Sequence, residues 1–252
     1  MVKNFFEKNV NNFCEGFIYE KEYINTITAL FIAFLGYYGI SKKNDNNINI
    51  LYSFLLSNGI TSSLNHYYNN LGFSYLDGIT MLLPVTFGNL QIYQFFLSKL
   101  SSWDNIYKLF YLFFPSLIYL SITLQEFKKN FEYIFLTLSL LLLGFIPLIN
   151  NYGKTECILK IRNNFIKGSL FVIIAAGLWF YSEPKCNDSK ISKKQKKKIA
   201  KLHLHGIWHI LSGYGFYLMI HSINMIILYD KNPTPDNINN IIHSFNKIIP
   251  KI

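Results

Sequence analysis

The sequence predicts an all-α membrane protein, a seven-transmembrane helix bundle. Of its 252 residues, 51% are hydrophobic and only 15% are charged, a composition that is typical of polytopic membrane proteins. Seven apolar segments are long enough, or nearly so, to cross about 30 Å of hydrocarbon. Their approximate limits are 23–40, 48–68, 74–97, 106–124, 131–150, 165–182 and 203–229.

Polar connections separate these segments within one domain, residues 1–229. SKKNDNN follows the first segment, SKLSSWDN the third and NNYGKTE the fifth, and a longer loop, 183–202, precedes the last. No internal repeat is evident. In the tail, 230–252, Pro233 and Pro235 end the last helix, and isoleucines at helical spacing then predict a short helix on the membrane surface. A disordered tail rich in Asn and Ile is the alternative.

Seven crossings place the two termini on opposite sides of the membrane. The end of the second segment and the starts of the third and the last then face the N-terminal side. His66, Asp77, His205 and His209 lie at these three places, so this topology brings them to one depth. The convergence depends on the count of spans between Asp77 and His205. Lysines are nearly balanced between the two sides, so the positive-inside rule does not fix the orientation.

The formal net charge of +10 comes mostly from the loops. Because the basic residues lie between apolar spans and not on one soluble face, we expect no nucleic-acid partner. We interpret the run from Lys193 to Lys198 as a solvated loop, with attraction to anionic lipid headgroups as the alternative. Three cysteines are too few for a disulfide scaffold, and no cleavable signal peptide or obligate protein partner is evident.

Three histidines form the pattern that is most informative about function. His205 and His209, in HLHGIWHILSGYGFY, are one helical turn apart and project from the same face, and His66 closes an earlier span. Three imidazoles provide three ligands of a tetrahedral metal site and leave the fourth position for water, as in catalytic zinc sites. This donor set favours zinc over magnesium or calcium.

Ser62 and Asp77 accompany His66. Ser62 lies one turn before His66, and Asp77 follows it across the probable turn NNLGF, at the mouth of the third span. A carboxylate there needs a partner, and a water activated by the metal is a suitable one: Asp77 can accept its proton and later pass it on. The Ser62 hydroxyl can donate a hydrogen bond to a developing oxyanion. Together these groups indicate metal-assisted hydrolysis of an amide or ester within a membrane.

Two simpler interpretations stay open. Membrane histidines often form hydrogen bonds between helices without binding a metal. Alternatively, Ser62, His66 and Asp77 form a Ser-His-Asp triad, although this leaves His205 and His209 without a role. We interpret His203 and His221 as non-ligands, because His203 points elsewhere and His221 lies deeper in the span.

The order S-x3-H, then D, then H-x3-H across seven spans resembles a superfamily of alkaline ceramidases, adiponectin/progestin-type receptors, haemolysin-III-like proteins and GPI-lipid-remodelling hydrolases. Within it the chain is most similar to the alkaline ceramidase family. HGIWHILSGYG is close to that family's H-x-W-W-H-x-L-T-G, and NFCEGFIYEKEYINT resembles its D-W-C-E segment followed by E-F-W-N-T. WFYSEPKC is similar to its W-x2-D-x3-C, with Ser182 at the position of the aspartate. The resemblance spans about residues 12–217.

The resemblance implies roles for the central residues. His66, His205 and His209 would bind zinc, Asp77 would transfer protons and Ser62 would stabilise the transition state. It implies cleavage of ceramide to a sphingoid base and a fatty acid, in the endoplasmic reticulum or Golgi. It does not indicate which acyl chain or sphingoid base is preferred.

The family also carries a calcium site and a disulfide near the N-terminus. The calcium ligands correspond to Asn12, the Phe13 carbonyl, Glu15 and Glu22, but Asn12 replaces an aspartate, which weakens the expected site because calcium prefers several carboxylates.

The resemblance implies a disulfide between Cys14 and Cys186. Such a disulfide requires the N-terminal side to be lumenal, which makes the C-terminus cytosolic and leaves Cys157 reduced. Two rival functions remain: a related lipid hydrolase of the GPI-remodelling type, and a non-catalytic receptor that keeps the fold and the metal.

Overall fold

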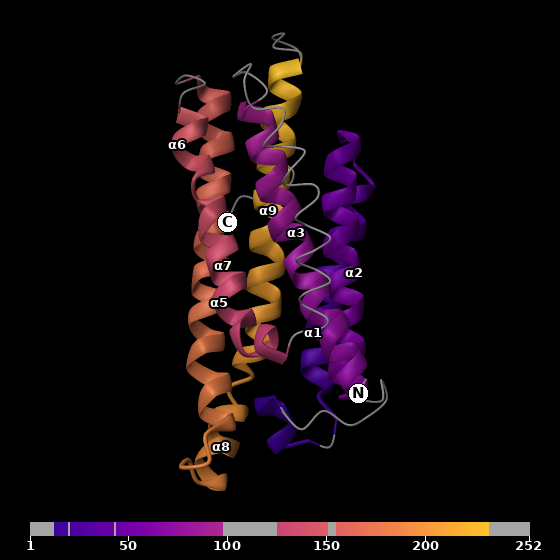
Figure 1. Ribbon diagram of the computed structural model, residues 1–252, viewed down its shortest axis with the longest axis vertical. Helices are drawn as coiled ribbons and strands as arrows, with labels where there is room; N and C mark the ends of the chain where they lie inside the picture. Colours follow the sequence, from indigo (N-terminus) through magenta and orange to yellow (C-terminus); the bar gives the residue numbers. More distant parts are fainter. Residues whose placement is uncertain (1–12, 20, 43, 98–124, 151–154, 232–252) are drawn as a thin grey trace.

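Long helices that run side by side make up the molecule (Figure 1). The computed structural model describes the chain except for residues 1–12, 20, 43, 98–124, 151–154 and 232–252. Every element among the described residues is a helix. In chain order these are η1 (Cys14–Phe17), α1 (Tyr23–Ile40), α2 (Asn46–Tyr68), α3 (Leu71–Leu97), α5 (Gln125–Leu142), α6 (Phe145–Asn150), α7 (Glu156–Asn187), α8 (Lys193–Ala200) and α9 (Leu204–Lys231).

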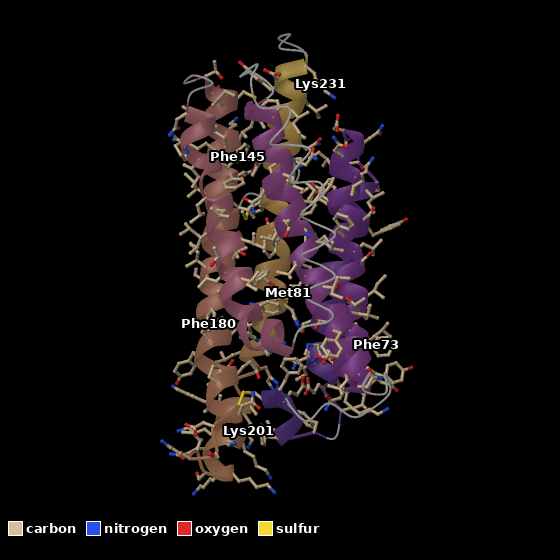
Figure 2. The ribbon with its side chains drawn as sticks, in the orientation of Figure 1. Phe73, Met81, Phe145, Phe180, Lys201 and Lys231 are labelled. Atoms are coloured by element: carbon tan, nitrogen blue, oxygen red, sulfur yellow. A yellow bond between two sulfur atoms is a disulfide. The ribbon has the colours of Figure 1, made fainter. Side chains whose placement is uncertain are left out.

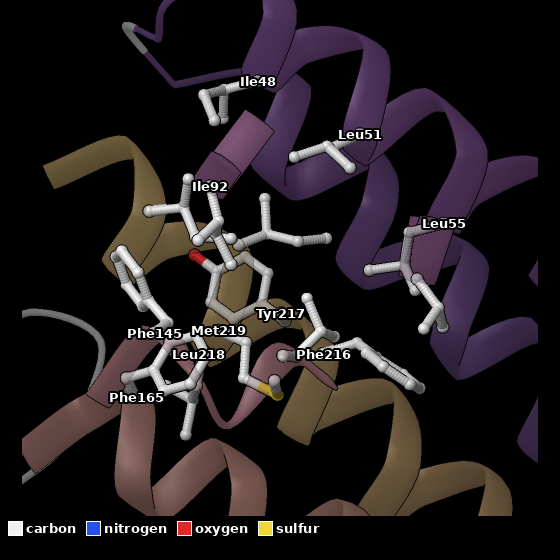
Figure 3. Close-up of a cluster of buried hydrophobic side chains, with 14 of the residues drawn as sticks. Ile48, Leu51, Leu55, Ile92, Phe145, Phe165, Phe216, Tyr217, Leu218 and Met219 are labelled. Carbon is white, nitrogen blue, oxygen red and sulfur yellow. The ribbon is translucent and has the colours of Figure 1, made fainter. Parts of the chain in front are cut away.

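Helix α9 is central and packs against α7 on one side and against α1 and α2 on the other. Figure 3 shows Tyr217 and Leu218 of α9 between Leu51 of α2 and the rings of Phe145 and Phe165. All five side chains are almost completely buried. Burying large apolar side chains at this density fixes the helices relative to one another and so fixes the ends that carry the polar residues.

Helices α1 and α2 approach closely because glycines face the contact. A Cβ atom added at Gly59 of α2 would lie 2.1 Å from the Ala33 backbone nitrogen, and one added at Gly36 of α1 would lie 2.4 Å from the Leu56 backbone nitrogen. Small residues at such positions let helix backbones pack tightly in a membrane. This contact holds the end of α2, where His66 lies, against the start of α1.

Among the described residues, four segments are long and apolar enough to cross a membrane: α1, Leu71–Ile92 within α3, α7, and Lys193–Lys231, which contains α9. Large apolar side chains such as Ile27 and Phe34 of α1 and Ile173 of α7 are exposed on the outside of the bundle, as expected for contact with lipid. The chain is therefore a multi-pass helical membrane protein. The predicted count of seven spans is not confirmed, because span 106–124 lies outside the described residues and α2 and α5 are less apolar.

Several predicted boundaries differ from the structure. The span predicted at 131–150 is two helices, α5 and α6, that are separated at Leu143 and Gly144. The loop predicted at 183–202 is largely helical, because α7 continues to Asn187 and the lysine run forms α8. Ser192 begins α8 with a capping box, and its lysines are mostly exposed. The predicted surface helix of the tail lies outside the described residues.

The turn between α2 and α3 is shorter than the predicted NNLGF. Asn69 takes a left-handed conformation, with φ of 47°, and ends α2, and Leu71 already begins α3. Asparagine tolerates this conformation better than most residues. The sharp reversal places the last turns of α2 beside the first turns of α3.

We expect Gly59→Ala to lower the free energy of unfolding by about 1–3 kcal/mol, because the new methyl group overlaps the α1 backbone. Thermal unfolding of the purified protein in detergent measures the change. Gly177→Ala is the matched control, since a Cβ atom there has nothing within 4 Å. Equal effects of the two substitutions would contradict the close α1–α2 contact.

Candidate metal centre

The three predicted histidines lie together at the end of the bundle where α1 and α9 begin and α2 and α7 end. Figure 2 shows this end near Lys201 and Phe73, with Lys231 at the opposite end. His205 and His209 lie in the first turns of α9, and His66 lies in the last turn of α2. All three are buried, and one nitrogen of each lies within 4.8 Å of the other two.

The Nδ1 atom of each histidine contacts a different side chain, two from α1 and one from α7. Nδ1 of His66 lies 2.6 Å from Glu22 Oε2, at the start of α1. Nδ1 of His205 lies 3.0 Å from Glu183 Oε1 of α7, and Nδ1 of His209 lies 3.1 Å from the Thr28 hydroxyl of α1. Since carboxylates only accept hydrogen bonds, His66 and His205 donate from Nδ1, which leaves the Nε2 lone pair to face the centre.

The donor set fits a zinc ion. Nε2 of His66 and Nε2 of His209 are 3.3 Å apart, and two ligands at about 2.05 Å from a tetrahedral ion would be about 3.3 Å apart. Metal-binding histidines almost always donate their other ring nitrogen to a carboxylate, carbonyl or water, as His66 and His205 do here. The histidines could therefore hold a metal ion, and their chemistry favours zinc.

Asp77 and Ser62 lie beside the histidines. Two α2 amides contact the Asp77 carboxylate: Asn65 Nδ2 is 3.0 Å from Oδ2 and Asn58 Nδ2 is 3.4 Å from Oδ1. Ser62, which is also close to Asp77, has its Oγ 3.5 Å from Nε2 of His209. The amides orient the carboxylate as an acceptor at the edge of the histidine cluster.

The N-terminal segment covers this cluster. The Phe13 ring lies 4.6 Å from the rings of both His66 and His205, measured between centroids. The buried Glu15 carboxylate accepts hydrogen bonds from the backbone N–H groups of Ile24 and Asn25, in the first turn of α1. Glu15 thus caps α1 from a distance and satisfies donors that a helix start leaves unpaired.

Glu22 binds a histidine with its side chain instead of capping the helix that it precedes. It precedes α1, but its side chain caps no backbone group and instead contacts His66. Burial raises the pKa of the Glu22 carboxyl group, but the interaction with His66 outweighs this and holds the pKa below its usual value. Of the predicted calcium ligands, Asn12 lies outside the described residues, and a calcium site at Asn12, Phe13, Glu15 and Glu22 stays a prediction.

Cys14 and Cys186 form a disulfide, with Cα atoms 5.3 Å apart, which confirms the pairing that the resemblance implied. Figure 2 shows it as a yellow bond near Lys201. It links η1 to the end of α7, and a small apolar cluster that includes Ala200 of α8 surrounds it. Cys157 is free and buried.

Comparison with known proteins identifies the family. A sequence model of the ceramidase family matches residues 10–252, nearly the whole chain and all of the site. The chain belongs to the ceramidase family. No curated protein and no solved structure matches the chain significantly. The predicted resemblance is therefore confirmed, and ceramidase membership implies a hydrolase that acts on an amide bond of a lipid substrate.

Four side chains that contact this ceramidase site were not predicted from the sequence. Glu183 and Thr28 contact the site from positions with no recognisable spacing to the histidines, whereas the two amides lie on α2, where Asn58 precedes Ser62 by one turn and Asn65 directly precedes His66. Two of these had a signal in the sequence: Glu183, since a carboxylate near the border of an apolar span needs a partner, and Asn58, which continues the helical spacing of Ser62 and His66. His203 precedes α9 in a left-handed conformation and His221 stacks on Tyr217, and neither belongs to the metal cluster.

We expect His209→Ala to abolish stoichiometric metal binding, because two imidazoles cannot hold the ion that three hold. Elemental analysis of the purified protein by mass spectrometry measures the metal per chain. His203→Asn is the control, since asparagine accepts the left-handed backbone there. Full metal content in His209→Ala would show that the three histidines are not the binding site.

Proposed function

We propose that this protein is a zinc-dependent intramembrane amidase that hydrolyses ceramide to a sphingoid base and a free fatty acid. The observation that carries the proposal is the convergence of three buried imidazoles beside the carboxylate of Asp77. The amide specificity rests on membership of the ceramidase family.

The residues of the site have separate chemical roles in this proposal. A zinc ion bound by the three imidazoles would acidify a water molecule and polarise a carbonyl oxygen. Asp77, held by Asn58 and Asn65, would accept a proton from the attacking water at its carboxylate and deliver it to the leaving amine. The Ser62 hydroxyl would donate a hydrogen bond to the oxygen of the attacked carbonyl.

Apolar cavities beside the site support a lipid substrate. One is lined by Met81, Phe135, Trp179 and Trp208 among others, and a second shares Phe135 and continues to Met219. Trp208 lies between the first cavity and the metal cluster, because it lines that cavity and its ring lies 5.0 Å from the ring of His209. Their apolar lining suits an acyl chain, but the cavities hold only about 10 and 30 Å³ and would have to widen to admit one.

The disulfide supports an orientation. Disulfides persist in oxidising compartments, so Cys14 and Cys186 favour a lumenal N-terminal side, with the metal site near the lumenal face and the C-terminus in the cytosol. The endoplasmic reticulum and the Golgi are the compartments that fit.

Calcium is the second ion of the proposal. Glu22 Oε1 is buried with no hydrogen-bond partner among the described residues, although Oε2 of the same carboxylate contacts both His66 and Asn25. A buried carboxylate oxygen without a partner is costly unless something binds it. A calcium ion that also contacts Asn12, the Phe13 carbonyl and Glu15 would satisfy it.

Activity is tested with purified protein and a panel of ceramides at alkaline pH, following fatty-acid release. We expect a zinc chelator to abolish release, Asp77→Asn to lower the rate about 10²- to 10⁴-fold and Ser62→Ala to lower it about 10²- to 10³-fold. His203→Asn should retain full activity.

The outcomes separate the rival functions. Release that persists after complete removal of the metal would overturn zinc dependence. No release from any ceramide, with zinc still bound, would favour the GPI-remodelling type of hydrolase or a receptor. Lipid profiling of cells that lack the protein then distinguishes these, by altered GPI anchors in the first case only.

We expect Cys14 and Cys186 to be oxidised in the cell. After membranes are isolated and denatured without a reductant, a maleimide reagent should label one cysteine per chain, Cys157, and three after reduction, which gel mobility resolves. Three labelled cysteines before reduction would place the N-terminal side in a reducing compartment. Cys157→Ser is the control that removes the signal of the unreduced protein.

A further inference from the structure

The carboxylate of Glu183 contacts two different parts of the protein at once. Its Oε1 accepts the hydrogen bond from Nδ1 of His205, at 3.0 Å, and its Oε2 accepts one from the backbone N–H of Cys14, at 3.1 Å. Glu183 and His205 are both about 95% buried, so water does not compete for these bonds. Glu183 therefore connects α7 with α9 and with η1.

The disulfide fixes the second of these contacts. Cys186 follows Glu183 by three residues on α7, so both side chains lie on one face of the helix. Cys14 is bound to that face twice, by its sulfur to Cys186 and by its N–H to Glu183. The position of the Cys14 N–H group, and through it the position of the Glu183 carboxylate, thus depends on the disulfide.

We propose that Glu183 is a positioning residue that couples the metal site to the Cys14–Cys186 disulfide. It orients the imidazole of His205 and keeps the proton on Nδ1, so that Nε2 faces the metal. The disulfide contributes to metal affinity mainly through this carboxylate, which is the direct link from Cys14 to a histidine of the site. The inference requires the metal site, but it does not depend on ceramide being the substrate.

No other side chain of similar size can fill this role. The two donors, His205 Nδ1–H and Cys14 N–H, approach opposite oxygens, and only a carboxylate offers an acceptor to each. A glutamine has one oxygen and one NH₂ group, so either orientation faces a donor with a donor. Ser182, at the position of the family's aspartate, does not substitute, because its hydroxyl donates to carbonyl groups of its own helix.

Among the described residues, Glu22, unlike Glu183, has no hydrogen bond to the segment that the disulfide anchors. Both of its described contacts use Oε2, towards His66 and towards the Asn25 side chain next to it on α1. It orients one ligand but does not connect that ligand to the disulfide. The two histidines with carboxylate partners are therefore held by different means, and His205 is expected to respond most directly to the loss of the disulfide.

The test measures zinc affinity by competition with a chromophoric chelator, together with the visible spectrum of the cobalt-substituted protein. Glu183→Gln should weaken zinc binding about 10- to 100-fold and shift the cobalt bands, because His205 loses its fixed orientation. Ser182→Ala is the matched control in the same turn of α7 and should leave both unchanged. Wild-type affinity and spectrum in Glu183→Gln would overturn the positioning role.

A double-mutant cycle tests the coupling to the disulfide. Replacing both cysteines, Cys14→Ala with Cys186→Ala, should weaken zinc binding in the wild type and cause a clearly smaller loss in the Glu183→Gln background. Equal losses in both backgrounds would show that the disulfide acts by another route, and no loss in either would show that it does not act on the metal.

Circular dichroism and thermal unfolding of each variant establish that it is folded. If Glu183→Gln does not fold, Glu183→Asp replaces it in the same cycle. The shorter carboxylate keeps the charge but does not reach both donors, so it should also weaken zinc binding and reduce the effect of the disulfide. An aspartate variant with wild-type affinity and an undiminished effect of the disulfide would overturn the coupling.

Discussion

The structure depends on the burial of three imidazoles whose Nε2 atoms converge on one point. Bringing three nitrogen lone pairs together in a poorly solvated place is unfavourable unless a cation lies between them. Glu22 and Glu183 enforce this arrangement. Each accepts a hydrogen bond from Nδ1–H of a histidine, so the unprotonated Nε2 atom of that ring faces the centre. An apolar bundle tolerates so many buried polar atoms because they satisfy one another within a single cluster.

The ends of the helices, more than their packed middles, determine the site. Helix α2 ends and α9 begins next to residues in left-handed conformations, Asn69 and His203, so each helix stops or starts at the level of the cluster. The glycine contact between α1 and α2 then holds Thr28 and His66 at the same depth. Because α9 is buried along most of its length, its register relative to α1 and α7 is fixed by packing, and the positions of His205 and His209 follow from that register.

Local spacing explains what could be predicted from the sequence. The i, i+4 pair of His205 and His209, and Ser62 one turn before His66, are consequences of helical periodicity, and the structure brings these four side chains together. The limits of α1 were predicted correctly, since its apolar run has clear polar borders. The partners of the histidines could not be predicted, because Thr28 and Glu183 reach them through packing between helices far apart in sequence. The split of the predicted span 131–150 was missed because the sequence is apolar on both sides of Leu143 and Gly144, and composition alone does not reveal a turn there.

The N-terminal segment belongs to the site and is not an appendage of the bundle. A glutamate at the start of a helix would normally accept hydrogen bonds from the first turn, yet Glu22 is turned away to His66. Glu15 takes over that task from η1, and the disulfide anchors η1 to α7. If Glu15 did not cap α1, the unpaired N–H groups of Ile24 and Asn25 would compete with His66 for the Glu22 carboxylate. The orientation of one imidazole therefore depends on a residue that does not contact it. For this reason a short N-terminal segment, covalently attached at Cys14, is a structural requirement of the metal centre.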